Sequence, residues 1–112
     1  MIFSVGDHIQ QIINGTKTQT RRKSSWYVVG KTYSIQPGRT EPGIPEGRIL
    51  ITNKMTESRL YLTGLRISRA DALAEGGYGP EQFEKLYSQM DRGWGVRWAY
   101  TFKFIPTEEA SQ

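Results

Sequence analysis

The segment from Gly15 to Arg22, GTKTQTRR, holds residue types that can bind a ligand together. Lysine and arginine side chains bind anions such as phosphate. On an extended strand Lys17 and Thr20 would point to opposite faces, whereas Thr20 and Arg22 would share one. A joint role for Lys17 and Thr20 therefore predicts a turn or bulge just after Gly15. An exposed polar edge strand fits the same pattern, so both interpretations stay open.

Other catalytic patterns have little support in the sequence. The chain contains no cysteine and one histidine, which argues against disulfides, thiolate zinc sites and histidine-based relays. We interpret His8, which follows Asp7 at a helix start, as a surface or partly packed imidazole. The string GKT at residues 30–32 matches part of a phosphate-binding loop, but Ser25 stands where the motif needs glycine. We expect neither a metal nor a cofactor.

Length and composition predict one compact domain over residues 1–105, followed by a polar, disordered tail over residues 106–112. A chain of 112 residues with 37% hydrophobic residues can bury one core and is too short for two. No apolar stretch approaches the ~18 residues that cross a bilayer, and the N-terminus lacks the pattern of a signal peptide. We therefore expect a cytoplasmic protein without a membrane partner. The oligomeric state stays open between a monomer and a weak dimer.

Positive charge is concentrated near the N-terminus. The chain carries a formal net charge of +4 at pH 7. Residues 1–40 contain six basic side chains and one acidic side chain, Asp7, whereas the rest of the chain is nearly balanced. This asymmetry favours an anionic ligand.

A short helix is expected before the GTKTQTRR segment, and strands are expected after it. Three isoleucines at positions 9, 12 and 13 recur at helical spacing until Gly15, and Ser4 with Asp7 forms a weak capping signal. The runs WYVV (26–29) and TYSIQ (32–36) are typical of strands separated by a turn.

The middle of the chain predicts a loop and two further strands. Residues 39–47, RTEPGIPEG, contain two prolines and two glycines, so they favour a mobile loop of a length that can flank a binding site. The runs RILIT (48–52) and RLYLTGLRIS (59–68) fit an antiparallel pair, separated by the polar NKMTES at 53–58.

Two helices and a strand are expected to complete the chain. Ser68 is expected to cap a helix that ends near Glu75, and Pro80 can begin the next helix. Large apolar residues alternate with other residues from Val96 to Phe104, which predicts the last strand. The order of elements indicates a small α+β fold, a mostly antiparallel β-barrel decorated by short helices.

Gly15, Lys17, Thr20 and Arg22 match the pattern G-x-K-x-x-T-x-R, and on this motif the chain resembles the ASCH domains, relatives of the PUA fold associated with RNA. The resemblance continues in VGKTYSIQPGR, in ISRADALAEGGYGPEQFEKLY and in WAYTFKF, so it covers roughly residues 5–104. It implies a PUA-like barrel with a cleft that is lined by the motif and sized for a base or a short RNA.

The resemblance also implies a reaction. Some ASCH proteins are similar to N4-acetylcytidine amidohydrolases, which use a lysine, a threonine and a glutamate. These roles carry over to Lys17 and Thr20, and the candidate glutamate is Glu75 in LAEGGYG. A threonine hydroxyl would attack the amide beside a neutral lysine amine, and the carboxylate would pass a proton to the cytosine amine. Other members are regarded as ribonucleases or as RNA-binding modules, so these remain alternatives to the metal-independent amidohydrolase that we favour.

Five residues near the motif are expected to contact RNA or a modified nucleoside: Arg21, Arg22, Lys23, Trp26 and Arg39. Trp26 can stack on a base, and Arg39 follows a Pro-Gly turn that exposes it. Three of the candidate site residues also have an ordinary interpretation. Lys17 can be a phosphate contact only, Glu75 an acidic helix end, and Trp26 part of a core strand.

Overall fold

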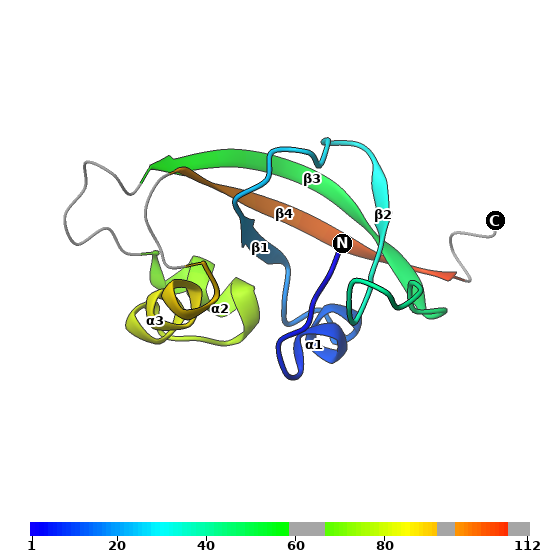
Figure 1. Ribbon diagram of the computed structural model, residues 1–112, viewed down its shortest axis with the longest axis horizontal. Helices are drawn as coiled ribbons and strands as arrows, with labels where there is room; N and C mark the ends of the chain where they lie inside the picture. The colour runs from blue at the N-terminus through cyan, green and yellow to red at the C-terminus, as the bar shows by residue number, and fades with distance from the viewer. Residues whose placement is uncertain (59–66, 92–95, 108–112) are drawn as a thin grey trace.

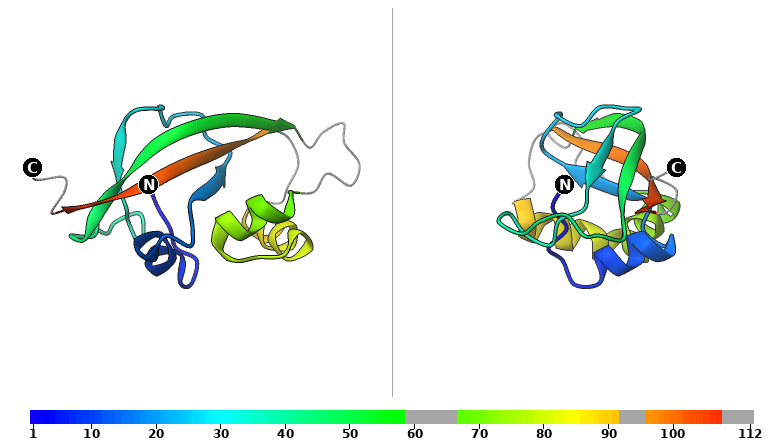
Figure 2. Two further views of the ribbon diagram at one scale, coloured as in Figure 1. Left: turned by 180° about the vertical axis from the view of Figure 1, so that it is seen from behind. Right: turned by 90° about the vertical axis from the view of Figure 1, so that its right-hand side faces the viewer.

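The computed structural model describes residues 1–58, 67–91 and 96–107. Its elements follow in the order α1 (His8–Asn14), β1 (Gln19–Arg22), β2 (Thr32–Ser34), β3 (Gly47–Ser58), α2 (Arg69–Gly76), α3 (Pro80–Asp91) and β4 (Val96–Pro106). The strands form one antiparallel sheet in the order β1-β4-β3-β2. The helices lie on one side of the long β3–β4 pair (Figures 1 and 2). The structure is therefore a small α+β fold.

Strands β3 and β4 form the longest ladder of the sheet. Ile49 pairs with Phe104 and Ile51 pairs with Phe102, so the alternating apolar residues of β4 face those of β3. Beyond a register shift after Ile51, the polar residues 53–58 continue to pair with β4. The prediction that residues 53–58 separate two strands is wrong, because pairing with the aromatic strand β4 extends β3 through them.

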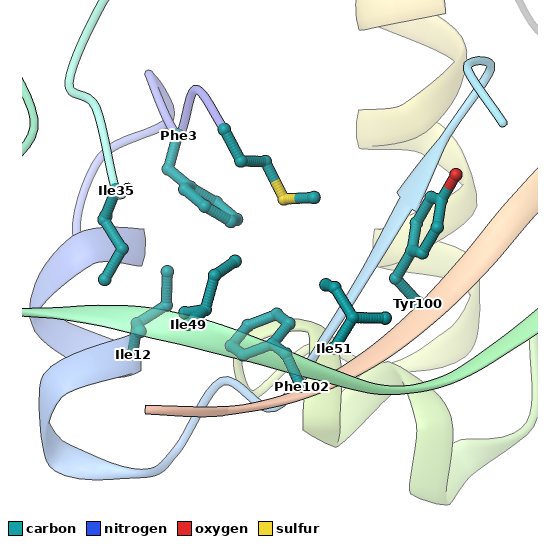
Figure 3. Packing of buried hydrophobic residues seen from close by; sticks show 8 residues of the cluster. Phe3, Ile12, Ile35, Ile49, Ile51, Tyr100 and Phe102 are labelled. Carbon is teal, nitrogen blue, oxygen red and sulfur yellow. The ribbon is translucent and has the colours of Figure 1, made fainter. Parts of the chain in front are cut away.

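The main core lies between this ladder, α1 and the N-terminal residues. Figure 3 shows Ile12 of α1 beside Ile49 of β3 and Phe102 of β4. The buried members are Met1, Phe3, Ile12, Ile35, Ile49, Ile51, Tyr100 and Phe102. A smaller cluster of Ile67, Ala72, Phe83 and Tyr87 joins α2 to α3. Met1 and Phe3 of the N-terminal segment belong to the main core, whereas β1 pairs with β4 and contacts α2.

Several local predictions are confirmed. The Ser68 hydroxyl accepts a hydrogen bond from the backbone N–H of Asp71 at 3.1 Å, as expected of an N-cap. Pro80 is the first residue of α3. The capping role of Ser4 is wrong, because a turn over residues 5–7 delays the start of α1 until His8.

The predicted closed barrel is not found within the described residues, where the sheet is open and β1 and β2 form its edges. Strand β1 has four residues and pairs beside Trp98 to Thr101, whereas β2 has three residues and pairs beside Arg48 to Leu50. These short edges lie at different positions along the β3–β4 ladder, so they do not meet.

The predicted strand at residues 26–29 is also wrong. Tyr27 packs against the rings of Tyr33 and Tyr100 at centroid distances of 4.9 and 5.4 Å, whereas Trp26 is 83% exposed and its neighbours Val28 and Val29 are exposed too. The backbone N–H groups of Trp26 and Val28 donate to the side chains of Ser24 and Tyr33 rather than to a neighbouring strand, so the segment does not pair as a strand.

The remaining predictions lie at the ends of the described segments. Pro106 pairs with Gly47 and the N–H of Thr107 donates to Glu46, so the expected tail does not begin at residue 106. Residues 108–112 lie outside the described residues, as do residues 59–66 of the predicted strand partner of β3.

Candidate functional site

The end of α1 positions Lys17. Gly15 caps α1 with a left-handed backbone conformation, φ 86°, and its N–H donates to Ile12. The chain then turns, the N–H of Lys17 donates to the carbonyl of Gln11 at 3.0 Å, and β1 begins at Gln19. Because Lys17 lies in this turn rather than in the strand, Lys17 and Thr20 line the same cavity. The predicted turn after Gly15 is confirmed.

The same turn satisfies the C-terminal end of α2. The last carbonyl groups of a helix have no partner within the helix and carry partial negative charge. Here the carbonyl of Ala74 accepts from the N–H of Thr18 at 2.7 Å, and that of Glu75 accepts from Lys17 Nζ at 2.6 Å. The carbonyl of Gly76 accepts from the Gln11 side chain at 3.0 Å. Segments far apart in the sequence therefore meet in one hydrogen-bonded joint.

A glycine is needed where this joint is tightest. Gly76 has a φ of 149°, and a Cβ atom there would lie 2.8 Å from Gln11 Oε1 and 3.3 Å from His8 Nε2. Replacement by an L-amino acid would therefore strain the backbone and displace the Gln11 side chain that hydrogen-bonds the Gly76 carbonyl.

The Glu75 carboxylate lies between two buried cations. Its Oε1 lies 3.3 Å from Lys17 Nζ, and its Oε2 accepts a hydrogen bond from Arg21 Nη1 at 2.8 Å. Arg21 also contacts Gln19 Oε1 at 3.0 Å and Asp71 at 3.6 Å. Arg21 is thus turned into the protein, whereas the prediction assigned it to an RNA-contacting surface together with Lys23.

The Lys17 amine is buried and fully hydrogen-bonded. It is 2% exposed, and besides the two bonds to Glu75 it donates to the carbonyl of Gln19 at 2.9 Å. Burial lowers the pKa of Lys17, the Glu75 carboxylate opposes this shift, and the nearby Arg22 and Arg21 add to it. The proton of this lysine is therefore easier to remove than that of a lysine in water.

Thr20 and Arg22 share one face of β1, as predicted. Arg22 Nε donates to Thr20 Oγ1 at 3.1 Å, and Nη2 donates to the carbonyl of Ile2 at 2.5 Å. The guanidinium carbon lies 4.8 Å from the centre of the Phe3 ring. Burial lowers the pKa of Arg22 from its usual value.

These groups line a cavity of about 210 Å³ between the N-terminal segment, α1, β1, α2 and α3. Its polar lining is Ser4, His8, Lys17, Thr20, Arg21, Arg22, Lys23 and Glu75, and its apolar lining includes Ile2, Phe3, Val5, Phe83, Leu86 and Tyr87. The volume lies below the roughly 300–1,000 Å³ of most ligand pockets, but the mixture of apolar walls and a few polar groups is typical of such sites. The three residues implied as catalytic are therefore brought together.

His8 is the residue of this site that the sequence interpretation missed. It is 7% exposed, lines the cavity, and its Nε2 lies 2.6 Å from the hydroxyl of Tyr78. Burial, with the positive charges of Lys17 and Arg22, lowers the pKa of His8 to about 4. Its burial could have been predicted from its position four residues before the apolar Ile12, because residues i and i+4 share a helix face.

The other predicted contacts lie further out. Lys23 is exposed and lines the cavity. Trp26 and Arg39 are exposed and are not among the lining residues. In residues 1–58, 67–91 and 96–107, no three potential metal ligands among His, Asp and Glu gather at one place. None of the helices described is both long and apolar enough for a transmembrane span.

Comparisons with known proteins add a likeness in fold. No family model matches the sequence, and no curated protein is significantly similar to it. The structure is similar to the crystal structure of protein EF3133 from Enterococcus faecalis V583, which is described by the family model DUF984. The TM-score is 0.55 with 16% sequence identity, and the match covers 92% of this chain and 71% of that one. At this identity the likeness concerns the fold alone.

Proposed function

We propose that this protein is an ASCH domain with a PUA-like fold, and that it hydrolyses the acetyl amide of N4-acetylcytidine or a similar acylated cytidine without a metal ion. One observation carries the proposal: the buried Lys17–Glu75 pair and the Thr20 hydroxyl line one cavity. The G-x-K-x-x-T-x-R motif that suggested the family supplies two of these three groups.

The Lys17–Glu75 pair can supply a base and an acid by moving one proton between its two members, without gaining or losing a proton from solvent. Moving one proton from Nζ to the carboxylate converts the ion pair into a neutral amine and a neutral acid. Burial lowers the pKa of Lys17, and because Arg21 stays hydrogen-bonded to Oε2, the transferred proton would lie on Oε1 of Glu75. The amine then accepts a proton from a nucleophile while the acid protonates a leaving group.

In the first half of the reaction the acetyl group moves to Thr20. The hydroxyl oxygen forms a bond to the acetyl carbon while its proton passes to the Lys17 amine. When the tetrahedral intermediate collapses, the carbon–nitrogen bond breaks and the cytosine N4 takes the proton of Glu75. Cytidine leaves, and the pair returns to its charged form.

In the second half water removes the acetyl group. The water oxygen forms a bond to the acetyl carbon as the Glu75 carboxylate takes its proton. Breakage of the ester bond releases acetic acid, which loses its proton to the solvent, and the Thr20 oxygen regains a proton from the Lys17 ammonium. The neutral amine and neutral acid are restored, so the cycle balances.

The cavity supports a nucleoside-sized substrate better than a bound RNA strand. The polar groups are enclosed together with Phe3, Phe83 and Tyr87, which offer rings against which a base can pack. RNA binding remains the second candidate because Trp26, at 83% exposed, is available to stack on a base outside the cavity. Such binding predicts an affinity that falls steeply with salt.

The test is release of cytidine from N4-acetylcytidine, followed by chromatography. We expect turnover by the wild type and a loss of about 10²–10⁴-fold in Lys17→Met and Thr20→Val, because each removes a group that handles the reacting atoms. Lys31→Met is the matched control, since Lys31 is exposed and does not line the cavity.

Urea unfolding of each variant separates loss of chemistry from loss of fold. Absence of cytidine release by the folded wild type, or unchanged turnover in folded Lys17→Met, contradicts the amidohydrolase proposal. A labelled oligonucleotide then distinguishes cleavage from simple binding.

A further inference from the structure

Two adjacent arginines of β1 differ in how their charge is compensated. Arg21 lies against the carboxylates of Glu75 and Asp71. Arg22 is bonded instead to neutral acceptors, the Thr20 hydroxyl and the carbonyl of Ile2, and no carboxylate within 4 Å pairs with it in the described part of the chain. Arg22 therefore places positive charge in the cavity wall without a protein counter-ion beside it.

Arg22 is half-buried in the wall of an open cavity, with neutral acceptors and the Phe3 ring around its charge, so negative charge that arrives there would be stabilised. Lys17 lines the same cavity, but its charge is paired with the Glu75 carboxylate. Burial lowers the pKa of Arg22, and the nearby Tyr27 and Glu75 oppose this shift. An anion that binds at this point, or that forms during a reaction, would gain a charge-assisted hydrogen bond from the guanidinium.

We propose that Arg22 is a catalytic residue that stabilises the negative charge formed on the Thr20 oxygen and on the acetyl carbonyl oxygen. This inference rests on the proposed function. The geometry favours it because Arg22 Nε already donates to Thr20 Oγ1 at 3.1 Å, so the guanidinium lies beside the atom that attacks. When that oxygen bonds to the acetyl carbon, the electron pair of the carbonyl double bond moves to its oxygen, one bond away from the attacked carbon.

The position of Arg22 argues against a phosphate contact as its main role. A substrate phosphate held by Arg22 would lie next to the Thr20 hydroxyl and would fill the space that the acetyl group needs. Preorganised donors near a developing oxyanion contribute mainly to the rate of the chemical step, whereas a phosphate contact contributes to substrate binding.

Kinetics of Arg22→Gln and Arg22→Lys on N4-acetylcytidine separate these roles. We expect kcat to fall by about 10²–10³-fold in Arg22→Gln, with KM within about twofold of the wild type, and a smaller loss in Arg22→Lys. Guanidinium chloride at millimolar concentration should restore part of kcat to Arg22→Ala, which a purely structural role would not allow. Arg39→Gln is the matched control because it removes the same charge from an exposed site outside the cavity.

The opposite kinetic pattern overturns the inference. If Arg22→Gln raises KM with kcat unchanged, or loses activity only on the phosphorylated form of the substrate, Arg22 binds phosphate instead. Unchanged kcat in both variants, or failure of guanidinium rescue in a folded Arg22→Ala protein, contradicts the catalytic role as well.

A second probe tests the inference without turnover. Methylboronic acid has the shape of an acetyl group and forms an anionic tetrahedral adduct with a reactive hydroxyl, which boron-11 NMR distinguishes from the trigonal acid. We expect the adduct in the wild type, its loss in Thr20→Val and at least tenfold weaker formation in Arg22→Gln. If the wild type releases no cytidine but forms an adduct that Arg22→Gln weakens, the substrate assignment fails and the role of Arg22 stands. No adduct in the wild type, or equal adduct in Arg22→Gln, overturns the role of Arg22.

Discussion

Lowering the pH from 7.5 to 5 should destabilise the protein through His8. The imidazole is buried beside Lys17 and Arg22, and this environment lowers its pKa from 6.5 to about 4. In the unfolded chain the imidazole titrates near its ordinary value. Between these two pKa values the unfolded state therefore holds one more proton than the folded state, so stability rises with pH in this range.

The size of the effect follows from the two pKa values. At pH 5 the unfolded imidazole is almost fully protonated and the folded one is largely neutral. Proton linkage then gives a loss of up to about 2 kcal/mol relative to pH 7.5. Most of the loss falls between pH 6.5 and pH 5, above the range in which ordinary carboxylates become protonated.

Urea unfolding of the wild type and of His8→Gln at both pH values measures this contribution. Between pH 7.5 and pH 5 the free energy of unfolding of the wild type should fall by up to about 2 kcal/mol more than that of His8→Gln. Glutamine does not titrate, so the difference between the two proteins cancels the contributions of all other titrating groups. NMR gives an independent reading, since His8 is the one histidine of the chain and its ring signals should not titrate above pH 5. Parallel stability profiles in the two proteins, or a histidine that titrates near 6.5, would refute the argument.

Three further predictions concern stability, measured by urea unfolding. Ser68→Ala should cost about 1 kcal/mol because it removes the hydrogen bond that caps α2, and Ser68→Asp should retain most of that stability. Gly15→Ala should cost about 1 kcal/mol or more because φ is 86° there, and a gain in stability would contradict the left-handed cap. Glu84→Ala should cost about 3 kcal/mol because Arg97, 1% exposed, donates two bonds to this carboxylate at 2.8 and 2.9 Å; Arg97→Met/Glu84→Leu should recover part of the loss.

The features that the sequence predicts well are those set by neighbouring residues. The cap at Ser68, the start of α3 at Pro80 and the turn after Gly15 each depend on the conformational preferences of a few adjacent positions. Strand β4 was also predictable because its alternation runs over most of its length. In the candidate site, the turn is what makes a joint position for Lys17 and Thr20 possible.

The features that escaped prediction depend on partners far away in the sequence. Arg21 is charged and in a polar run, and only the Glu75 carboxylate on α2 explains its burial. His8 is buried because Tyr78 covers it from the α2–α3 connection. Strand β3 is extended because it pairs with β4 as far as Ser58. Trp26 is exposed because its neighbour Tyr27 is the side chain that packs against Tyr100. No local pattern contains this information.

The joint at the end of α2 has a consequence for the order of folding. The last carbonyls of this helix are satisfied by Gln11, Lys17 and Thr18, so its final turn cannot be completed by the helix alone. The Lys17–Glu75 contact closes a loop of 58 residues, and closing so long a loop is entropically costly. The last turn of α2 and the cavity beside it should therefore be completed only when the segment from α1 to β1 docks against this helix.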